Sequence, residues 1–172
     1  MKIIRVVGDD LDFHPDSSLI TGSNPFFFPD FGGEWVGDLY MAVHINRLGK
    51  SISAKFAPRY YDGIALALHF RPADIEAIRP GTLSGIDSTF AIGTWTAPAE
   101  APGLSATADD GTTISLDILP AEKLNEAIAR VSQYTTLRMG DIILIPYPGA
   151  RPFAVGPHSR ITAGNLIDIR IV

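Results

Sequence analysis

The sequence predicts an α+β fold that is mostly β, and two observations support this class. Apolar segments of strand length recur along the chain, about seven in all, whereas only one segment has a clear helical period. The 16 glycines and 13 prolines imply many turns between short elements rather than a helical bundle. Because 46% of the 172 residues are hydrophobic, the chain can bury one core, and we expect a single domain over residues 1–172.

The N-terminal segment is expected to form a strand followed by a long loop. Apolar residues concentrate in residues 3–7, and Gly8-Asp9-Asp10 closes that segment. Residues 13–28 contain Pro15, Gly22 and Pro25 and are predicted to be loop. The aromatic run at residues 26–28 is expected to lie in the core or in a dimer contact rather than along a substrate wall.

Residues 38–46 carry the most informative pattern in the chain. Every second residue is apolar, and Asp38, Tyr40, Ala42, His44 and Asn46 stand between the apolar positions. A period of two is typical of a half-buried β-strand. The second face of this strand is therefore expected to carry its polar groups into a site or into solvent.

The next elements are a short helix and a buried strand. Ser53 is expected to cap a helix that contains the awkward Pro58. Residues 64–70 form a continuous apolar run, which predicts a strand buried on both faces with His69 at its end. One helical turn is expected over residues 73–77, after Pro72.

The C-terminal half supplies the helix and the remaining strands. Strands are predicted over residues 89–95, 113–118, 140–145 and 167–171, with a loop or irregular hairpin over residues 97–111. Apolar residues spaced three and four apart from Leu124 to Val131, opened by Pro120, predict the helix.

Charge and composition exclude several classes of function. The net charge is −5 and the basic residues are scattered, so nucleic-acid binding has little support. The absence of cysteine removes disulfides, thiolate nucleophiles and soft metal sites. The first residues turn acidic too early for a signal peptide or a spanning helix, so we expect a cytoplasmic protein without membrane contact.

Several short motifs resemble the fumarylacetoacetate hydrolase family in order and spacing. The resemblance covers roughly Phe13 to Val172, and it rests on residues 13–19, 47–50, 56–62, 86–87 with 91–93, 134–137 and 140–144. It implies layered, mixed β-sheets in a roll with a few short helices, and a homodimer. It also implies a magnesium or calcium ion held by three carboxylates, and hydrolysis of a carbon–carbon bond or decarboxylation in acylpyruvates or β-keto acids. In that chemistry the metal polarises the keto and carboxylate oxygens and stabilises the enolate.

The metal positions implied by the resemblance depart from the family pattern. A Glu-x-Glu pair of the family corresponds to Asp38-Leu39-Tyr40, and the third metal carboxylate corresponds to His69. A phenol is a poor ligand for a hard divalent ion, because its pKa lies near ~10. Asp38, Tyr40 and His69 are therefore expected to bind magnesium weakly or not at all.

The implied catalytic and substrate positions are also changed. A family lysine corresponds to His14, another lysine to Ser84 and an arginine to Ala73, whereas Asp74 and Asp87 are retained. Tyr147 stands where the family has a Gly-Thr-Pro that lines the substrate pocket. These assignments make His14, Ser84 and Asp87 the candidate catalytic residues, and Asp74 and Tyr147 the candidate substrate contacts. Structural roles are the alternatives: Asp74 as a helix cap, Asp87 as a loop anchor and Tyr147 as packing.

Two functional hypotheses follow from the changed positions. In the first, the protein is catalytically impaired or non-catalytic, a dimeric binding or structural protein with no expected cofactor, and His69 is a buried neutral histidine bonded to Tyr40 or Asp38. In the second, Asp38 and His69 hold a metal such as Mg, Mn or Zn, and His14 shuttles a proton in hydrolysis or decarboxylation of a small keto acid. His44 lies about 20 Å along the strand from Asp38 and is not expected to contribute.

Overall fold

The computed structural model describes residues 1–22, 24–74, 78–98, 104–107, 113–116, 119–163 and 167–172. Its larger sheet has the order β2-β1-β8-β3-β4-β5, and β9 pairs with β3. Strand β1 runs parallel to β8, and the other pairs are antiparallel. The strands of this sheet are β1 Lys2–Val7, β2 Asp10–Pro15, β3 Trp35–Ile45, β4 Tyr61–Pro72, β5 Phe90–Ile92, β8 Ile142–Pro146 and β9 Phe153–Val155.

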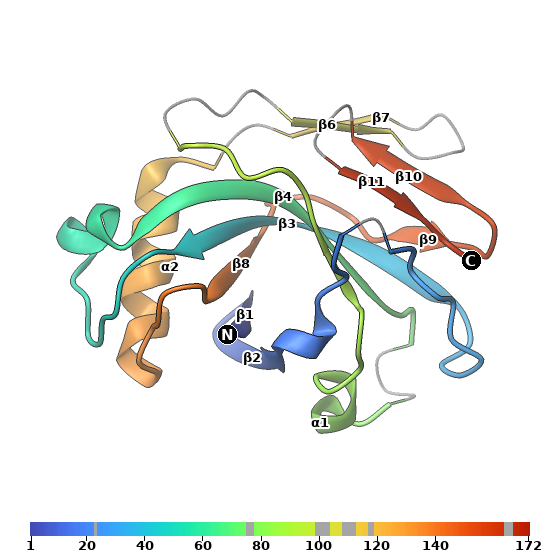
Figure 1. Cartoon of the computed structure of the whole chain (residues 1–172), viewed down its shortest axis with the longest axis horizontal. Helices are drawn as coiled ribbons and strands as arrows, with labels where there is room; N and C mark the ends of the chain where they lie inside the picture. The colour runs from blue at the N-terminus through green and yellow to red at the C-terminus, as the bar shows by residue number, and fades with distance from the viewer. Residues whose placement is uncertain (23, 75–77, 99–103, 108–112, 117–118, 164–166) are drawn as a thin grey trace.

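A second, antiparallel sheet has the order β11-β10-β6-β7. Its strands are β6 Leu104–Thr107, β7 Thr113–Leu116, β10 Arg160–Ala163 and β11 Ile167–Arg170. The helices are α1 Pro80–Leu83, α2 Ala121–Tyr134, and the 3-10 segments η1 Asp16–Ser18 and η2 Ala54–Arg59. The described residues thus confirm the α+β, mostly β class, and the larger sheet is mixed and curled (Figure 1).

The two faces of the larger sheet are buried against different neighbours. On one face, Leu39, Met41 and Val43 of β3 join the main core, to which α2 and the smaller sheet contribute. On the other face, Tyr40 and Ala42 join a smaller core formed with residues of β1, β4, β5 and β8. The long strands β3 and β4 curve across the molecule, with β1 and β2 lying inside the curve (Figure 1).

Most predicted elements are present, with two corrections. The segment predicted as loop, residues 13–28, begins with the last three residues of β2, which pairs with β1 from Asp10 to Pro15. The second face of β3 is not open along its length, since the smaller core covers Tyr40 and Ala42. In the aromatic run, Phe26 is buried, as expected for a core residue, whereas the side chain of Phe27 is 67% exposed.

Two helix predictions had different outcomes. Residues 54–59 form a 3-10 segment rather than an α-helix, and Ser53 precedes it without a side-chain capping bond. Pro58 inside the segment is compatible with so short an element. The turn predicted over residues 73–77 falls partly outside the described residues.

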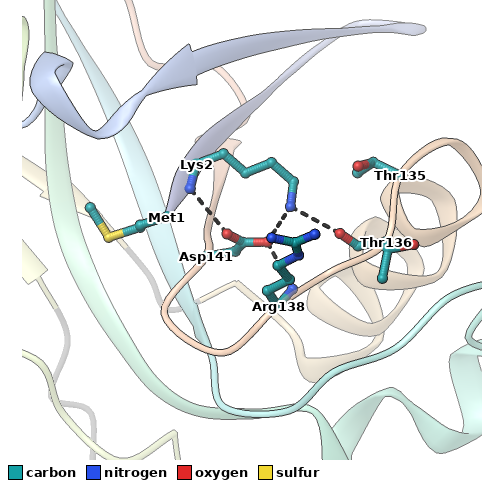
Figure 2. A pocket seen from close by; sticks show the side chains of 6 residues that line it. All are labelled: Met1, Lys2, Thr135, Thr136, Arg138 and Asp141. Carbon is teal, nitrogen blue, oxygen red and sulfur yellow. Dashed lines mark hydrogen bonds and ion pairs between the residues drawn. The ribbon is translucent and has the colours of Figure 1, made fainter.

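A buried carboxylate fastens the first strand to the start of β8. Asp141 is 1% exposed, accepts backbone N–H bonds from Lys2 (3.0 Å) and Arg138 (2.8 Å), and forms an ion pair with the Lys2 ammonium (Figure 2). These groups line a surface cavity of about 370 Å³ with Met1, Thr135 and Thr136. Because Asp141 already accepts all these bonds, it acts as an anchor for the β1–β8 pair.

Within the described residues, no helix combines the length and apolar character needed to span a bilayer.

Candidate functional site

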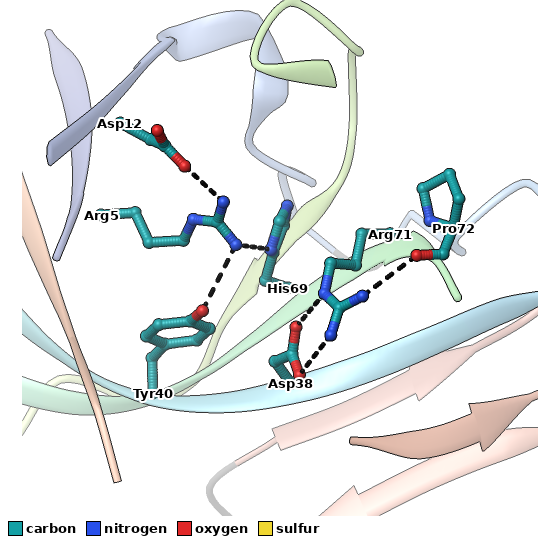
Figure 3. A network of polar contacts seen from close by, with 7 residues as sticks. All are labelled: Arg5, Asp12, Asp38, Tyr40, His69, Arg71 and Pro72. Atoms are coloured by element: carbon teal, nitrogen blue, oxygen red, sulfur yellow. Dashed lines mark hydrogen bonds and ion pairs between the residues drawn. The ribbon is translucent and has the colours of Figure 1, made fainter. Parts of the chain in front are cut away.

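The three positions at which the resemblance implies metal ligands lie together on one face of the larger sheet. Asp38 of β3 pairs directly with His69 of β4. Tyr40 follows Asp38 by two residues, so its side chain points to the same face. The pairing of β3 with β4 therefore brings all three predicted positions into one place (Figure 3).

Asp38 is bound by an arginine from the neighbouring strand. Arg71 of β4 donates from Nε to Oδ2 of Asp38 at 2.5 Å and from Nη2 to Oδ1 at 3.3 Å. The remaining amino group of Arg71 donates to the Pro72 carbonyl at 3.1 Å. A two-point guanidinium–carboxylate contact is among the strong ion pairs of proteins, so both Asp38 oxygens are engaged.

A second arginine lies between the other two positions. Arg5 of β1 is 8% exposed, and its Nη1 lies 3.0 Å from Nδ1 of His69 and 3.4 Å from the Tyr40 hydroxyl. Its Nη2 forms an ion pair with Asp12, which stands opposite Arg5 in the β1–β2 ladder. The guanidinium of Arg5 therefore joins β1, β2, β3 and β4 (Figure 3).

His69 is neutral, and its tautomer follows from its partner. Burial lowers the pKa of His69 well below its ordinary value, and the nearby Arg5, His14 and Arg71 lower it further. Because an arginine side chain can only donate, Nδ1 of His69 accepts and the ring proton lies on Nε2. Nε2 is buried without a hydrogen-bond partner among the described residues. Neither ring nitrogen thus offers a free lone pair.

The other two side chains of the cluster have fixed protonation states as well. Burial raises the pKa of the Tyr40 phenol, so Tyr40 is neutral near pH 7. Burial by itself lowers the pKa of Arg5, but the Tyr40 and Asp12 oxygens outweigh this effect and raise that pKa above its ordinary value. The cluster therefore holds a permanent cation beside neutral Tyr40 and His69.

His14 of β2 lies beside His69. Its ring centroid is 5.7 Å from that of His69 and 4.7 Å from that of Phe90. Burial, and secondarily Arg5, lower the pKa of His14 to about 4, although Asp12 and a hydrogen bond with the backbone of Ser84 oppose the shift. His14 is thus neutral near pH 7 and cannot donate a proton as an imidazolium there.

Three further predicted site residues, Asp74, Asp87 and Tyr147, lie outside the strands that carry Arg5, Asp38, Tyr40, His69 and Arg71. Asp74 is exposed and lines a different cavity, of about 530 Å³, with Phe31 and Glu34. Asp87 is exposed in the turn before β5. Tyr147 is buried in the main core, and its hydroxyl has no hydrogen-bond partner among the described residues. His44 bonds instead to Asp62, at 2.7 Å, near the far end of β3.

The donor set does not fit a hard divalent cation. Magnesium, manganese and calcium sites are built mainly from anionic or carbonyl oxygens. Here Asp38 is the one carboxylate of the three positions and is held by Arg71, Tyr40 is a neutral phenol, and the accepting nitrogen of His69 is used by Arg5. Among the described residues, no group of three or more His, Cys, Asp or Glu side chains could hold a metal ion.

Sequence reasoning missed three charged residues of this site, Arg5, Asp12 and Arg71. A signal was present for each, because Arg5 lies inside an apolar strand and Arg71 follows His69 by two residues on the same strand face. Asp12 and His14 alternate in the same way on β2. Because residues 13–28 are predicted to be loop, the alternation of Asp12 and His14 is not interpreted as part of a strand.

Comparison with known proteins identifies the fold. No protein-family profile and no curated protein matches the sequence. A Yersinia pestis CO92 protein assigned to the fumarylacetoacetate hydrolase family matches with a TM-score of 0.83 at 21% identity, over 99% of this chain and 92% of that chain. Fumarylpyruvate hydrolase from Pseudomonas aeruginosa, solved with Mn²⁺ and pyruvate, matches with a TM-score of 0.84 at 16% identity, over 100% and 89% of the two chains.

A third solved structure extends the likeness to another hydrolase. Maleylpyruvate hydrolase from Sphingobium sp. SYK-6 matches with a TM-score of 0.77 at 19% identity, over 99% of this chain and 70% of that chain. The likeness spans nearly all of the chain in each case, while the sequences have diverged widely. The chain therefore has the fold of the fumarylacetoacetate hydrolase family.

Proposed function

We propose that this protein is a divergent member of the fumarylacetoacetate hydrolase family that is impaired in, or lacks, metal-dependent chemistry on acylpyruvates and β-keto acids. The ordered motifs of the sequence and the fold of the whole chain support membership. Fold alone does not carry function, so the proposal about activity rests on the site.

The observation that carries the proposal is the state of Asp38. It is the one carboxylate among the three positions at which the resemblance implies metal ligands, and Arg71 holds both of its oxygens. A divalent ion would have to displace a partly buried ion pair to reach this carboxylate. Breaking the pair would leave the Arg71 guanidinium, which is 16% exposed, without its carboxylate, so the displacement costs free energy.

The alternative, an altered metal site formed by Asp38 and His69, is less compatible with the contacts. The two residues are neighbours, but each side chain is bound by a different arginine. Both contacts would have to break to give a two-ligand site. We therefore favour a binding or structural role for a homodimer over hydrolysis or decarboxylation of a keto acid.

The exposed aromatic side chain of Phe27 supports the homodimer. It is 67% exposed, and it stands between Phe26 in the core and the half-buried Phe28. Light scattering of the purified protein and of Phe27→Asp tests this part of the proposal. A dimer that the substitution converts to monomer supports it, and a wild-type monomer refutes it.

The central test combines elemental analysis, thermal shift and turnover on the purified protein. We expect no stoichiometric metal, no stabilisation by magnesium, manganese, zinc, pyruvate or oxaloacetate, and no cleavage of an acylpyruvate. A stoichiometric metal or measured cleavage would refute the proposal.

Any ligand effect would then be assigned with two matched double variants. Asp38→Ala with His69→Phe removes the candidate pair. Asp62→Ala with His44→Phe removes an exposed aspartate–histidine pair from the same two strands. An effect abolished by the first variant and kept by the second would establish the altered metal site.

A further inference from the structure

We infer that Arg5 is the resident cation of this site, and that its guanidinium takes the place a divalent metal ion would have among the positions of Asp38, Tyr40 and His69. The inference rests on the proposed function. It deepens that proposal by naming the Arg5 guanidinium as the positive charge that occupies the site in place of a metal ion. Arg5 is a positioning residue in this view, because it acts through its contacts with Tyr40, His69 and Asp12.

The curl of the larger sheet brings Arg5 close to Tyr40 and His69. Strands β8 and β3 lie between β1 and β4, and three strand spacings correspond to about 14 Å in a flat sheet. Arg5 nevertheless reaches His69 at 3.0 Å. The curvature brings β1 over the face that carries Tyr40 and His69 (Figure 3).

The contacts of Arg5 use the lone pairs that a metal ion would need. Its Nη1 lies within reach of both Nδ1 of His69 and the Tyr40 oxygen, at 3.0 and 3.4 Å. A guanidinium has only donors and a metal ion only accepts electron pairs, so the two cations compete for the same atoms. Bound arginine and bound metal are therefore mutually exclusive at Nδ1 of His69, which has a single lone pair, and they compete at the Tyr40 oxygen.

Charge complementarity around Arg5 supports the same conclusion. Asp12 forms an ion pair with Arg5, and Asp38 forms a separate ion pair with Arg71, so each carboxylate is balanced by one guanidinium. His14 and His69, which approach Arg5 from β2 and β4, are neutral. The two ion pairs leave no net negative charge to attract a divalent cation.

The first experiment is chemical rescue. Arg5→Ala should unfold at a lower temperature than wild type, and millimolar guanidinium or methylguanidinium should recover part of that loss by entering the space left by the side chain. Arg160→Ala, which removes a guanidinium from an exposed ion pair, should show no recovery. If Arg5→Ala does not fold, the same ions should raise its refolding yield. Equal responses of the two variants, or none, would overturn the inference.

The second experiment converts the site. Tyr40→Glu with His69→Asp restores carboxylates at two positions, and it is made with Arg5 kept and with Arg5→Ala. Calorimetric titration with Mn²⁺ should show at least about tenfold tighter binding when Arg5 is absent, a difference of about 1.4 kcal/mol. Equal Mn²⁺ affinity of the two proteins would overturn the inference.

The outcomes separate this inference from the proposed function. Cleavage of an acylpyruvate by wild type that a chelator leaves unchanged would refute the proposed function but not the role of Arg5. Saturable Mn²⁺ binding by wild type that Asp38→Ala and His69→Phe abolish would refute the role of Arg5, whether or not the protein is active.

Discussion

Asp38 and His69 face each other directly across β3 and β4, yet each is held by a different arginine. Arg71 lies on β4, as His69 does, and is the next residue on the same face of that strand. Arg5 lies on β1 and reaches His69 because the sheet is curled. Two arginines thus divide a site that the resemblance assigns to one metal ion. Separate measurements on the Asp38–Arg71 ion pair and on the Arg5 contacts can therefore test this arrangement.

The Asp38–Arg71 pair should contribute measurably to stability. The two side chains are 15% and 16% exposed. A double-mutant cycle with Asp38→Asn and Arg71→Met should give a coupling free energy of about 1–3 kcal/mol in urea unfolding. The Arg160–Asp168 pair has similar chemistry but is more than half exposed, and its cycle should give a clearly smaller value. Equal coupling in the two cycles would contradict the structural role of the Asp38–Arg71 pair.

Acid should destabilise the protein through its buried histidines. The pKa of His14 falls from 6.5 to about 4 on folding, so the unfolded chain binds more protons between these values. Stability should therefore decline as pH falls from 6.5 toward 4, by about 3 kcal/mol for this residue. His69 acts in the same direction, because its pKa is also lowered.

Urea unfolding at several pH values between 7 and 4 checks this prediction. The pH dependence of the unfolding free energy should be reduced in His14→Leu. His158→Gln, which replaces an exposed histidine, is the matched control variant. An unchanged slope in His14→Leu would show that folding does not lower the pKa of His14.

Removal of the hydroxyl from two buried tyrosines should affect the free energy of unfolding differently. The Tyr147 hydroxyl has no partner among the described residues and its pKa is raised by burial, so Tyr147→Phe should be neutral or stabilising by about 1 kcal/mol. The Tyr40 hydroxyl lies near Arg5, so Tyr40→Phe should destabilise by about 0.5–1.5 kcal/mol. Thermal unfolding of both variants measures the contrast, and destabilisation by Tyr147→Phe would indicate a bound partner at that hydroxyl.

Asp141 should be the most sensitive carboxylate at the junction of β1 and β8. Asp141→Ala leaves two backbone N–H groups without their acceptor and the Lys2 ammonium with only the Thr136 carbonyl, and it should cost about 2–4 kcal/mol. Lys2→Met removes only the partly exposed ammonium and should cost less. Denaturant unfolding of both variants provides the comparison, and a larger loss in Lys2→Met would reverse the assignment.

The sequence predicts the elements whose patterns are local. Alternation along β3 and the helical period of α2 depend on neighbouring residues, and both elements are found where expected. Strands β9 and β10, with three and four residues, are too short to carry a clear period, and their pairing depends on residues far along the chain.

The site could be predicted only in part, for the same reason. The pairing of Asp38, Tyr40 and His69 follows from two strong strand patterns and from the family resemblance. The alternation that places Asp12 and His14 on one face of β2 is local, but the loop prediction from residue 13 onward obscured it. The contacts of Arg5 with Tyr40 and His69 join residues 35 and 64 positions apart across the curl of the sheet, so no local window of the sequence reports them.

The parallel pairing of β1 with β8 also determines when the chain can fold during synthesis. Lys2 and its carboxylate partner are 139 positions apart, so the ribosome must translate most of the chain before the first strand can meet its neighbour. At roughly 5–20 residues per second, that wait lasts on the order of ten seconds. Closure of so long a loop favours slow, late assembly of the sheet, and the nascent strand depends on its hairpin with β2 for cover in the meantime.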